Sequence, residues 1–143
     1  MRYLTATDGS EESDAAVEYA TRQAAAFDAT LEIAHVLEPK TELIEGEVVL
    51  PGGERAAQLG EQTLEQARRL AASTVEAEDE SVRIETELLA GRPANAIAER
   101  ARETGADAIF VGHRGLSEER ERVVGSVAKS VLDRADVPVT VVR

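Results

Sequence analysis

The chain has 143 residues, enough for one domain with a buried core, and it has no cysteine, which excludes disulfides and thiolate metal sites. Its formal net charge is -12, from 28 acidic and 16 basic residues. This balance argues against a nucleic-acid partner, because a phosphate backbone requires a basic surface. No apolar run approaches the roughly 20 residues of a membrane helix, and residues 1–8 lack the layout of a signal peptide. We therefore expect a cytoplasmic protein with no membrane partner.

Arginine greatly outnumbers lysine among the basic residues. Lys40 and Lys129 are the only lysines, and all the other basic residues are arginines. A chain with many acids and few lysines is suited to a salt-rich cytoplasm, where screening reduces self-repulsion. The composition favours a halophilic protein, although an ordinary acidic surface would give the same charge.

Strand-like and helical apolar spacings alternate from the start of the chain. Residues 3–7 and 30–37 are strand-like runs. Between them, residues 11–27 have apolar positions at helical spacing, and Ser10 is a suitable N-cap. Prolines and glycines then predict a loop between Glu38 and Glu54, and the sequence leaves open whether this loop closes over a ligand.

The second half of the chain continues the alternation. Residues 54–77 are predicted to form a long helix, and Pro93 and Gly105 are suited to begin and end the next helix. A further helix is predicted over residues 126–135. Three more strand-like runs lie between and after these helices, at residues 82–89, 108–111 and 137–142.

Strands that alternate with helices indicate the α/β class. We expect residues 1–143 to form a single domain with a doubly wound, five-stranded parallel sheet and helices on both faces. Right-handed crossovers leave few strand orders, and 3-2-1-4-5 is favoured. The first and fourth strands are then neighbours where the winding reverses, and ligands bind beyond the carboxyl ends of strands at such a point.

Glycine-containing turns follow the two strands that should be neighbours. The first strand leads into Asp8-Gly9-Ser10, and the fourth leads into Gly112-His113-Arg114-Gly115. After nine intervening residues, Gly125-Ser126 opens the last predicted helix. Backbone without a Cβ can approach a ligand closely, and the N–H groups at a helix start suit an anion. The spacing therefore predicts a phosphate-binding site.

The glycine pattern, Gly112-x-x-Gly115 followed by nine residues and Gly125-Ser126, resembles the ATP-binding signature of the universal stress protein family. The resemblance covers nearly the whole chain. It is carried by Asp8-Gly9-Ser10, His35-Val36, Gly91-x-Pro93, Gly112-His113-Arg114-Gly115 and Val137-Pro138-Val139. It implies a regulatory role in stress response and a homodimer that pairs through residues 137–142, which form an apolar edge strand in the expected order.

The resemblance also implies which residues bind an adenine nucleotide. Asp8 and the backbone before it would border the adenosine, the Val36 backbone would read the adenine edge, and the glycine turns would hold the ribose and phosphates. The implied set is Ala6, Thr7, Asp8, Val36, Val111, Gly112, Gly115, Gly125, Ser126 and Val127. Acids at positions 118, 119 and 121 disfavour a triphosphate unless a metal or salt screens them. The expected ligand is therefore ATP with Mg²⁺ or a related adenine nucleotide such as AMP.

The sequence favours a binding protein over an enzyme, because neither histidine has an evident catalytic partner and His35 is expected to pack within its strand. Asp8 has a structural interpretation too, as a helix cap or an Asx-turn residue. Two alternatives stay open. One is a slow Mg²⁺-dependent ATPase that uses Asp8, and the other is a member of the same fold that binds no nucleotide and acts through protein contacts. A phospho-receiver domain is disfavoured because Asp8 lacks an acidic neighbour.

Overall fold

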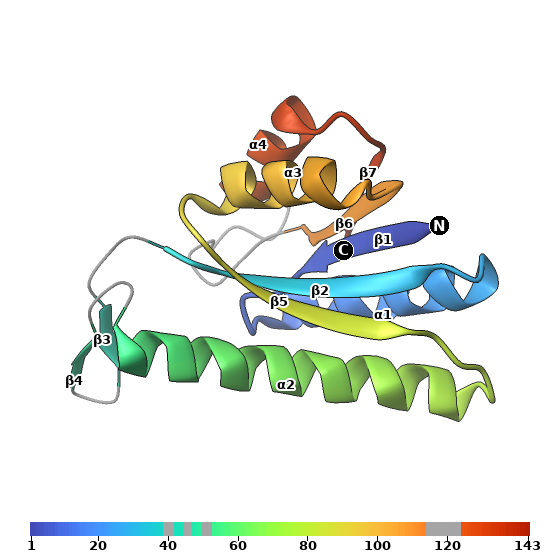
Figure 1. Cartoon of the computed structure of the whole chain (residues 1–143), viewed down its shortest axis with the longest axis horizontal. Helices are drawn as coiled ribbons and strands as arrows, with labels where there is room; N and C mark the ends of the chain where they lie inside the picture. Colours follow the sequence, from blue (N-terminus) through green and yellow to red (C-terminus); the bar gives the residue numbers. More distant parts are fainter. Residues whose placement is uncertain (39–41, 45–46, 50–52, 114–123) are drawn as a thin grey trace.

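The computed structural model describes residues 1–38, 42–44, 47–49, 53–113 and 124–143 (Figure 1). For residues 42–44 and 47–49 it describes the backbone only. The helices of the described residues are α1 (Glu11–Ala26), α2 (Glu54–Ala77), α3 (Pro93–Thr104) and α4 (Ser126–Arg134). The strands are β1 (Arg2–Ala6), β2 (Thr30–Leu37), β3 (Glu42–Ile44), β4 (Glu47–Val49), β5 (Ile84–Ala90), β6 (Ala108–Gly112) and β7 (Val139–Val142).

Five of these strands form one parallel sheet in the order β5-β2-β1-β6-β7. Numbered along the chain within this sheet, the order is 3-2-1-4-5, which confirms the prediction. The central strand β1 pairs Ala6 with Ala34 of β2 and Thr5 with Phe110 of β6. The carboxyl ends of these three strands therefore meet at one edge of the sheet.

Helices cover both faces of the sheet, with α1 and α2 on one face and α3 and α4 on the other (Figure 1). Each face has its own apolar core. On the α1 and α2 face, the core includes Val17, Ala20, Ile33, Leu64, Ala67 and Phe110. On the α3 and α4 face, it includes Leu4, Ala94, Ile97, Ile109, Ala128 and Val131. Because alanines fill much of both cores, the helices lie close to the sheet.

The first half of α2 lies especially close to β2 and β5. A Cβ on Gly60 would lie 2.7 Å from Leu88 Cδ1, 3.2 Å from Leu37 Cδ2 and 3.3 Å from His35 Cδ2. Any side chain at this position would push the helix away from the sheet or displace these three residues. Gly60 therefore sets the distance between α2 and the carboxyl half of β2.

Two short strands occupy part of the segment that was predicted to be a loop. β3 and β4 pair in antiparallel fashion as a separate sheet, with Leu43 opposite Val48. The loop prediction is wrong for these residues. It gave weight to the prolines and glycines and overlooked two short apolar runs separated by Glu45-Gly46, which is the spacing of a hairpin. The other residues from 39 to 52, and with them the question of closure over a ligand, lie outside the described residues.

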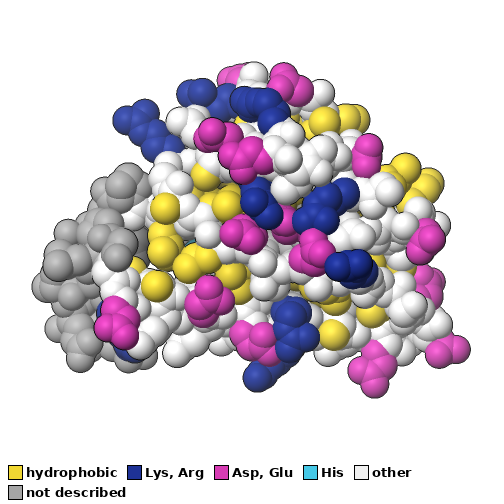
Figure 2. Space-filling model, in the orientation of Figure 1, with side chains coloured by type: hydrophobic (Ala, Val, Ile, Leu, Met, Phe, Trp, Pro, Cys, Tyr) yellow, Lys and Arg dark blue, Asp and Glu magenta, His cyan; other side chains and the backbone are white. Residues whose placement is uncertain are grey.

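A buried carboxylate joins three elements of the α3 face. Glu32 of β2 is 2% exposed, and it accepts hydrogen bonds from Arg2 Nη2 at 2.5 Å, Arg100 Nε at 2.8 Å and Arg100 Nη2 at 3.0 Å. Burial alone would raise the pKa of Glu32, but the hydrogen bonds and charges of Arg100 and Arg2 outweigh it and lower that pKa. Figure 2 shows acidic and basic side chains interspersed over the face of the molecule that carries β5 and α3.

Candidate functional site

The predicted binding residues gather at the carboxyl edge of the sheet, around the adjacent ends of β1 and β6. β1 ends at Ala6 and leads through Thr7 and Asp8 into α1, and β6 ends with Val111 and Gly112. Val36 lies near the end of β2, on the other side of β1. The start of α4 reaches the end of β6 because Gly125 N donates to His113 O at 2.7 Å. Gly115 lies outside the described residues.

The turn after β1 is held by a cluster of hydroxyl groups. Thr7 Oγ1 accepts a hydrogen bond from Gly9 N at 3.2 Å and lies 3.2 Å from Ser13 Oγ. Ser13 N donates to Ser10 Oγ at 3.2 Å, which confirms Ser10 as the N-cap of α1. Thr7 and Ser13 are 4% and 5% exposed, so these bonds are largely protected from water. The turn that carries Asp8 is therefore preorganised.

Asp8 has a structural part in this turn. Its Oδ1 accepts from Ser10 N at 3.0 Å, which is the Asx-turn arrangement that the sequence left open. Gly9 has a φ of 83°, a conformation that strongly favours glycine. The Asx-turn accounts for an aspartate at this position, and the turn presents its carboxylate at the end of β1.

The first turns of α1 carry a dense negative charge. Burial raises the pKa of Asp14, and the carboxylates of Glu18, Asp8 and Glu11 raise it further. An anionic ligand beside these groups would be disfavoured unless a cation accompanied it. The Mg²⁺ expected from the acids at positions 118, 119 and 121 stays a prediction.

Gly112 packs against the first turn of α1. A Cβ at this position would lie 2.7 Å from Glu12 O, 2.8 Å from Glu12 C and 3.0 Å from Ser13 N. The sequence suggested that this glycine makes room for a ligand, and the structure supplies a second reason, since backbone atoms of α1 fill that space. Gly112 therefore fixes the end of β6 against the helix that follows the Asp8 turn.

His113 connects the last strand to the start of α4. Its N donates to Val142 O at 2.7 Å, and its O accepts from Gly125 N at 2.7 Å. The residue is 4% exposed, and its Nε2 is buried with no hydrogen-bond partner among the residues that the structure describes. No catalytic role was expected for His113, because no carboxylate partner for it could be assigned from the sequence. Its bonds to β7 and α4 are made by backbone atoms, and a pattern of side chains in the sequence does not predict such bonds.

The helix α4 begins next to the end of β6, at a glycine N-cap. Gly125 is the N-cap and has no side chain to cap the helix, whereas Ser10 caps α1. Ser126 and Val127, the first two residues of α4, are exposed. Because the N–H groups of a first helical turn carry partial positive charge, this helix start can bind a phosphate. The phosphate-binding site predicted at this end of α4 stays a prediction.

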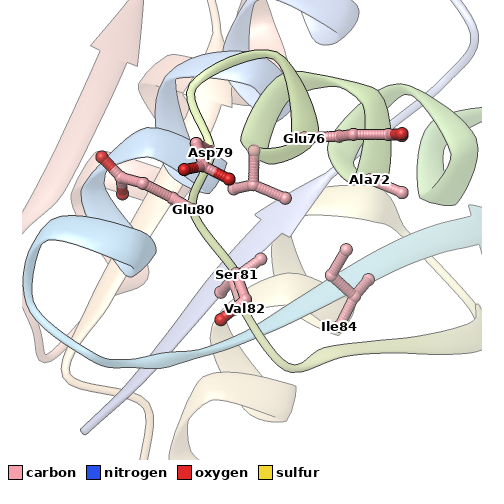
Figure 3. Close-up of a pocket in the computed structure, with 8 residues that line it drawn as sticks. Ala72, Glu76, Asp79, Glu80, Ser81, Val82 and Ile84 are labelled. Atoms are coloured by element: carbon pink, nitrogen blue, oxygen red, sulfur yellow. The ribbon is translucent and has the colours of Figure 1, made fainter.

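A pocket of about 280 Å³ lies elsewhere, between the end of α2 and the start of β5 (Figure 3). Its lining includes the apolar residues Val75, Val82 and Ile84 and the acidic residues Glu76 and Asp79. None of the predicted binding residues lines it. The described residues contain no cluster of three or more His, Cys, Asp or Glu side chains able to hold a metal ion, and none of their helices is both long and apolar enough to cross a membrane.

The fold and the carboxyl-edge turns define a doubly wound α/β protein with one switch point between β1 and β6. The model of the universal stress protein family matches residues 1–143. A universal stress protein of Methanocaldococcus jannaschii is 35% identical over 144 residues, which cover 96% of this chain and 78% of the relative. The universal stress protein YxiE of Bacillus subtilis is 32% identical over 151 residues, which cover 99% of this chain and 98% of YxiE. The chain belongs to the universal stress protein family, as the sequence motifs implied.

Solved structures agree with this assignment. A universal stress protein in complex with cAMP has a TM-score of 0.75 and 28% identity, over 99% of this chain and 97% of its own. The universal stress protein from Archaeoglobus fulgidus in complex with dAMP has a TM-score of 0.74 and 20% identity. The comparison covers 100% of this chain and 98% of the other. At that identity the second comparison shows the shared fold alone.

Proposed function

We propose that this protein binds an adenine nucleotide at the carboxyl edge of the sheet, with the phosphates at the start of α4 and the adenosine beside Asp8 and Val36. The observation that carries the proposal is the position of the α4 N-terminus, which the hydrogen bond from Gly125 N to His113 O places at the end of β6. The cAMP complex of a related protein supports an adenine nucleotide as the class of ligand. The acids near the site favour Mg²⁺ with a triphosphate, or a monophosphate without it.

The proposal is tested by the nucleotide that the protein retains. The protein is purified in high salt with Mg²⁺ and denatured, and the released nucleotides are identified by chromatography. Gly125→Val places a branched side chain at the start of α4 and is expected to abolish retention. Gly53→Val is the matched control, because Gly53 is the N-cap of α2 with a φ of -76° and a ψ of 163°, close to the -64° and 159° of Gly125.

Thermal unfolding gives a second readout. A ligand at 100 times its Kd stabilises a protein by about 2.7 kcal/mol, which corresponds to a rise in Tm of about 5–10 °C for a chain of this size. We expect this rise for the parent and for Gly53→Val, and none for Gly125→Val. If the parent neither retains a nucleotide nor gains stability from Mg-ATP or AMP, the proposal fails and a role through protein contacts replaces it.

We further propose that the protein acts by binding, as a cytoplasmic regulator of stress response, and does not turn over its ligand rapidly. The described carboxyl edge offers Asp8, which is engaged in the Asx-turn, but no aligned base beside it. Release of inorganic phosphate from Mg-ATP measures turnover directly. Turnover that disappears in Asp8→Ala while binding persists would establish an ATPase in place of a binding regulator.

A homodimer through β7 completes the proposal. β7 lies at one edge of the sheet, pairs there with β6, and all four of its residues are half-buried in the single chain. An edge strand with valines at three of four positions is suited to pair with a second copy. Analytical ultracentrifugation at micromolar concentration in high salt is expected to show a dimer, and a monomer there would contradict this part of the proposal.

A further inference from the structure

The ring of His35 lies between α2 and the turn that carries Asp8. His35 Nδ1 is 2.7 Å from the carbonyl oxygen of Thr7, the residue just after β1. On the other side, His35 Cδ2 would be 3.3 Å from a Cβ at Gly60, so the backbone of α2 lies close behind the ring. The ring is therefore packed between a helix backbone and a single peptide carbonyl.

The partner of His35 determines where its proton lies. A carbonyl oxygen only accepts hydrogen bonds, so Nδ1 must carry the proton that bridges the 2.7 Å to Thr7 O. In the neutral ring this leaves Nε2 unprotonated. The packing thus selects one of the two tautomers of His35, and that choice can be observed by NMR.

The Thr7 carbonyl is one end of the peptide unit that joins Thr7 to Asp8. The other end, Asp8 N, donates to Ser13 Oγ at 3.3 Å. Because a peptide unit is planar, partners at both ends fix its orientation and with it the start of Asp8. Thr7 N also donates to Ala34 O at 2.8 Å, next to His35 in β2. His35 and Ser13 thus hold the Asp8 turn from opposite sides.

We propose that His35 is a positioning residue for the nucleotide site, which acts through the Thr7–Asp8 peptide and is backed by α2 at Gly60. The inference rests on the proposed function, since it names a residue that sets the geometry of that site without touching the ligand. The Nδ1–H group of His35 orients the peptide that presents Asp8, and α2 approaches the ring closely at Gly60.

Two substitutions separate the hydrogen bond from the bulk of the ring. In His35→Asn the side-chain amide nitrogen stands at the position of Nδ1, so it can still donate to Thr7 O. In His35→Gln the amide nitrogen stands at the position of Nε2, so the donor to Thr7 O is lost while most of the volume is kept. Leu70→Ala, in the second half of α2 and partly buried against the same core, is the control for lost stability alone.

The experiment combines affinity and NMR. Affinities for Mg-ATP and AMP are measured by calorimetry for the parent and the three variants. The ¹⁵N shifts of the histidine rings report the tautomer, and the amide shifts of residues 7–10 report the turn. We expect a protonated Nδ1 on His35, affinity about fivefold lower in His35→Gln, the size of one lost hydrogen bond, and affinity within twofold of the parent in His35→Asn and Leu70→Ala.

A protonated Nε2 with a bare Nδ1 on His35 would overturn the inference, as would a folded His35→Gln variant with the affinity and the turn shifts of the parent. If the parent binds neither nucleotide, the proposed function fails separately. The amide shifts then decide the positioning role alone. Shifts displaced in His35→Gln and restored in His35→Asn support it, and shifts unchanged in both overturn it.

Discussion

Replacing Glu32 with glutamine should destabilise the protein by about 2–3 kcal/mol. Glu32 accepts three hydrogen bonds from Arg2 and Arg100, and hydrogen bonds to charged groups each contribute about 1.5–3 kcal/mol. Removing one partner of a fully buried ion pair costs about 3–5 kcal/mol. Here the two arginine side chains are 24% and 23% exposed, so water reaches the charges left behind and the cost is lower.

The assay is urea unfolding of the parent, Glu32→Gln and Glu87→Gln across pH. Glu87 is 43% exposed and lies 3.6 Å from Arg100, so its substitution controls for loss of charge at the rim of the same cluster and should cost less than about 1 kcal/mol. The pKa of Glu32 is lowered in the folded state, so its contribution is complete above its ordinary pKa of 4.5 and is lost as the pH falls through the lowered value.

The difference in free energy of unfolding between the parent and Glu32→Gln should therefore become smaller in acid. A loss below about 1 kcal/mol at neutral pH, or a loss equal to that of Glu87→Gln, would refute the reasoning. A difference that widens as the pH falls would refute the assigned direction of the pKa shift.

Two further predictions concern the carboxyl edge and the surface charge. Gly112→Ala should cost about 1–3 kcal/mol in urea unfolding, because its Cβ would meet the backbone of α1 at 2.7 Å, and it should weaken nucleotide binding by displacing the Asp8 turn. Gly105→Ala, at the C-cap of α3, should lower stability without changing affinity. Because the net charge is -12 and acids cluster on α1, the free energy of unfolding should rise with salt from low to molar concentration. Stability that is indifferent to salt would contradict the halophilic hypothesis.

The architecture could be predicted because it depends on local patterns. Alternating apolar spacings placed the elements of the main sheet within a few residues, and right-handed crossovers left few strand orders. Deviations occur at the ends of elements. β7 begins at Val139, two residues later than predicted, because Pro138 has no N–H to join the sheet. The β3 and β4 hairpin was missed because two short apolar runs carry less signal than the prolines around them.

The partners of buried polar groups could not be predicted. Glu32 lies between apolar neighbours in its strand, a pattern that predicts a side chain facing solvent. Helices cover both faces of this sheet, however, so Glu32 is buried. Arg100, its main partner, is separated from it by 68 positions and lies on another element. His35 was correctly expected to pack in its strand, but its bond to Thr7 depends on the register of β1 and β2. The sequence could predict that the turns after β1 and β6 meet at one edge of the sheet, whereas tertiary contacts determine how the Asp8 turn is held.

The pairing of β1 with β6 also has a consequence for the order of assembly. Thr5 Oγ1 donates to Phe110 O across 105 positions, so the switch point joins two strands that lie far apart in the chain. During synthesis β1 can pair with β2 early, yet its other side has no neighbour until residues 108–112 have left the ribosome. A chain that ends before β6 contains most of the α1 and α2 core residues, but it has no switch point. The edge at which we propose that a nucleotide binds therefore forms only after most of the chain has been synthesised.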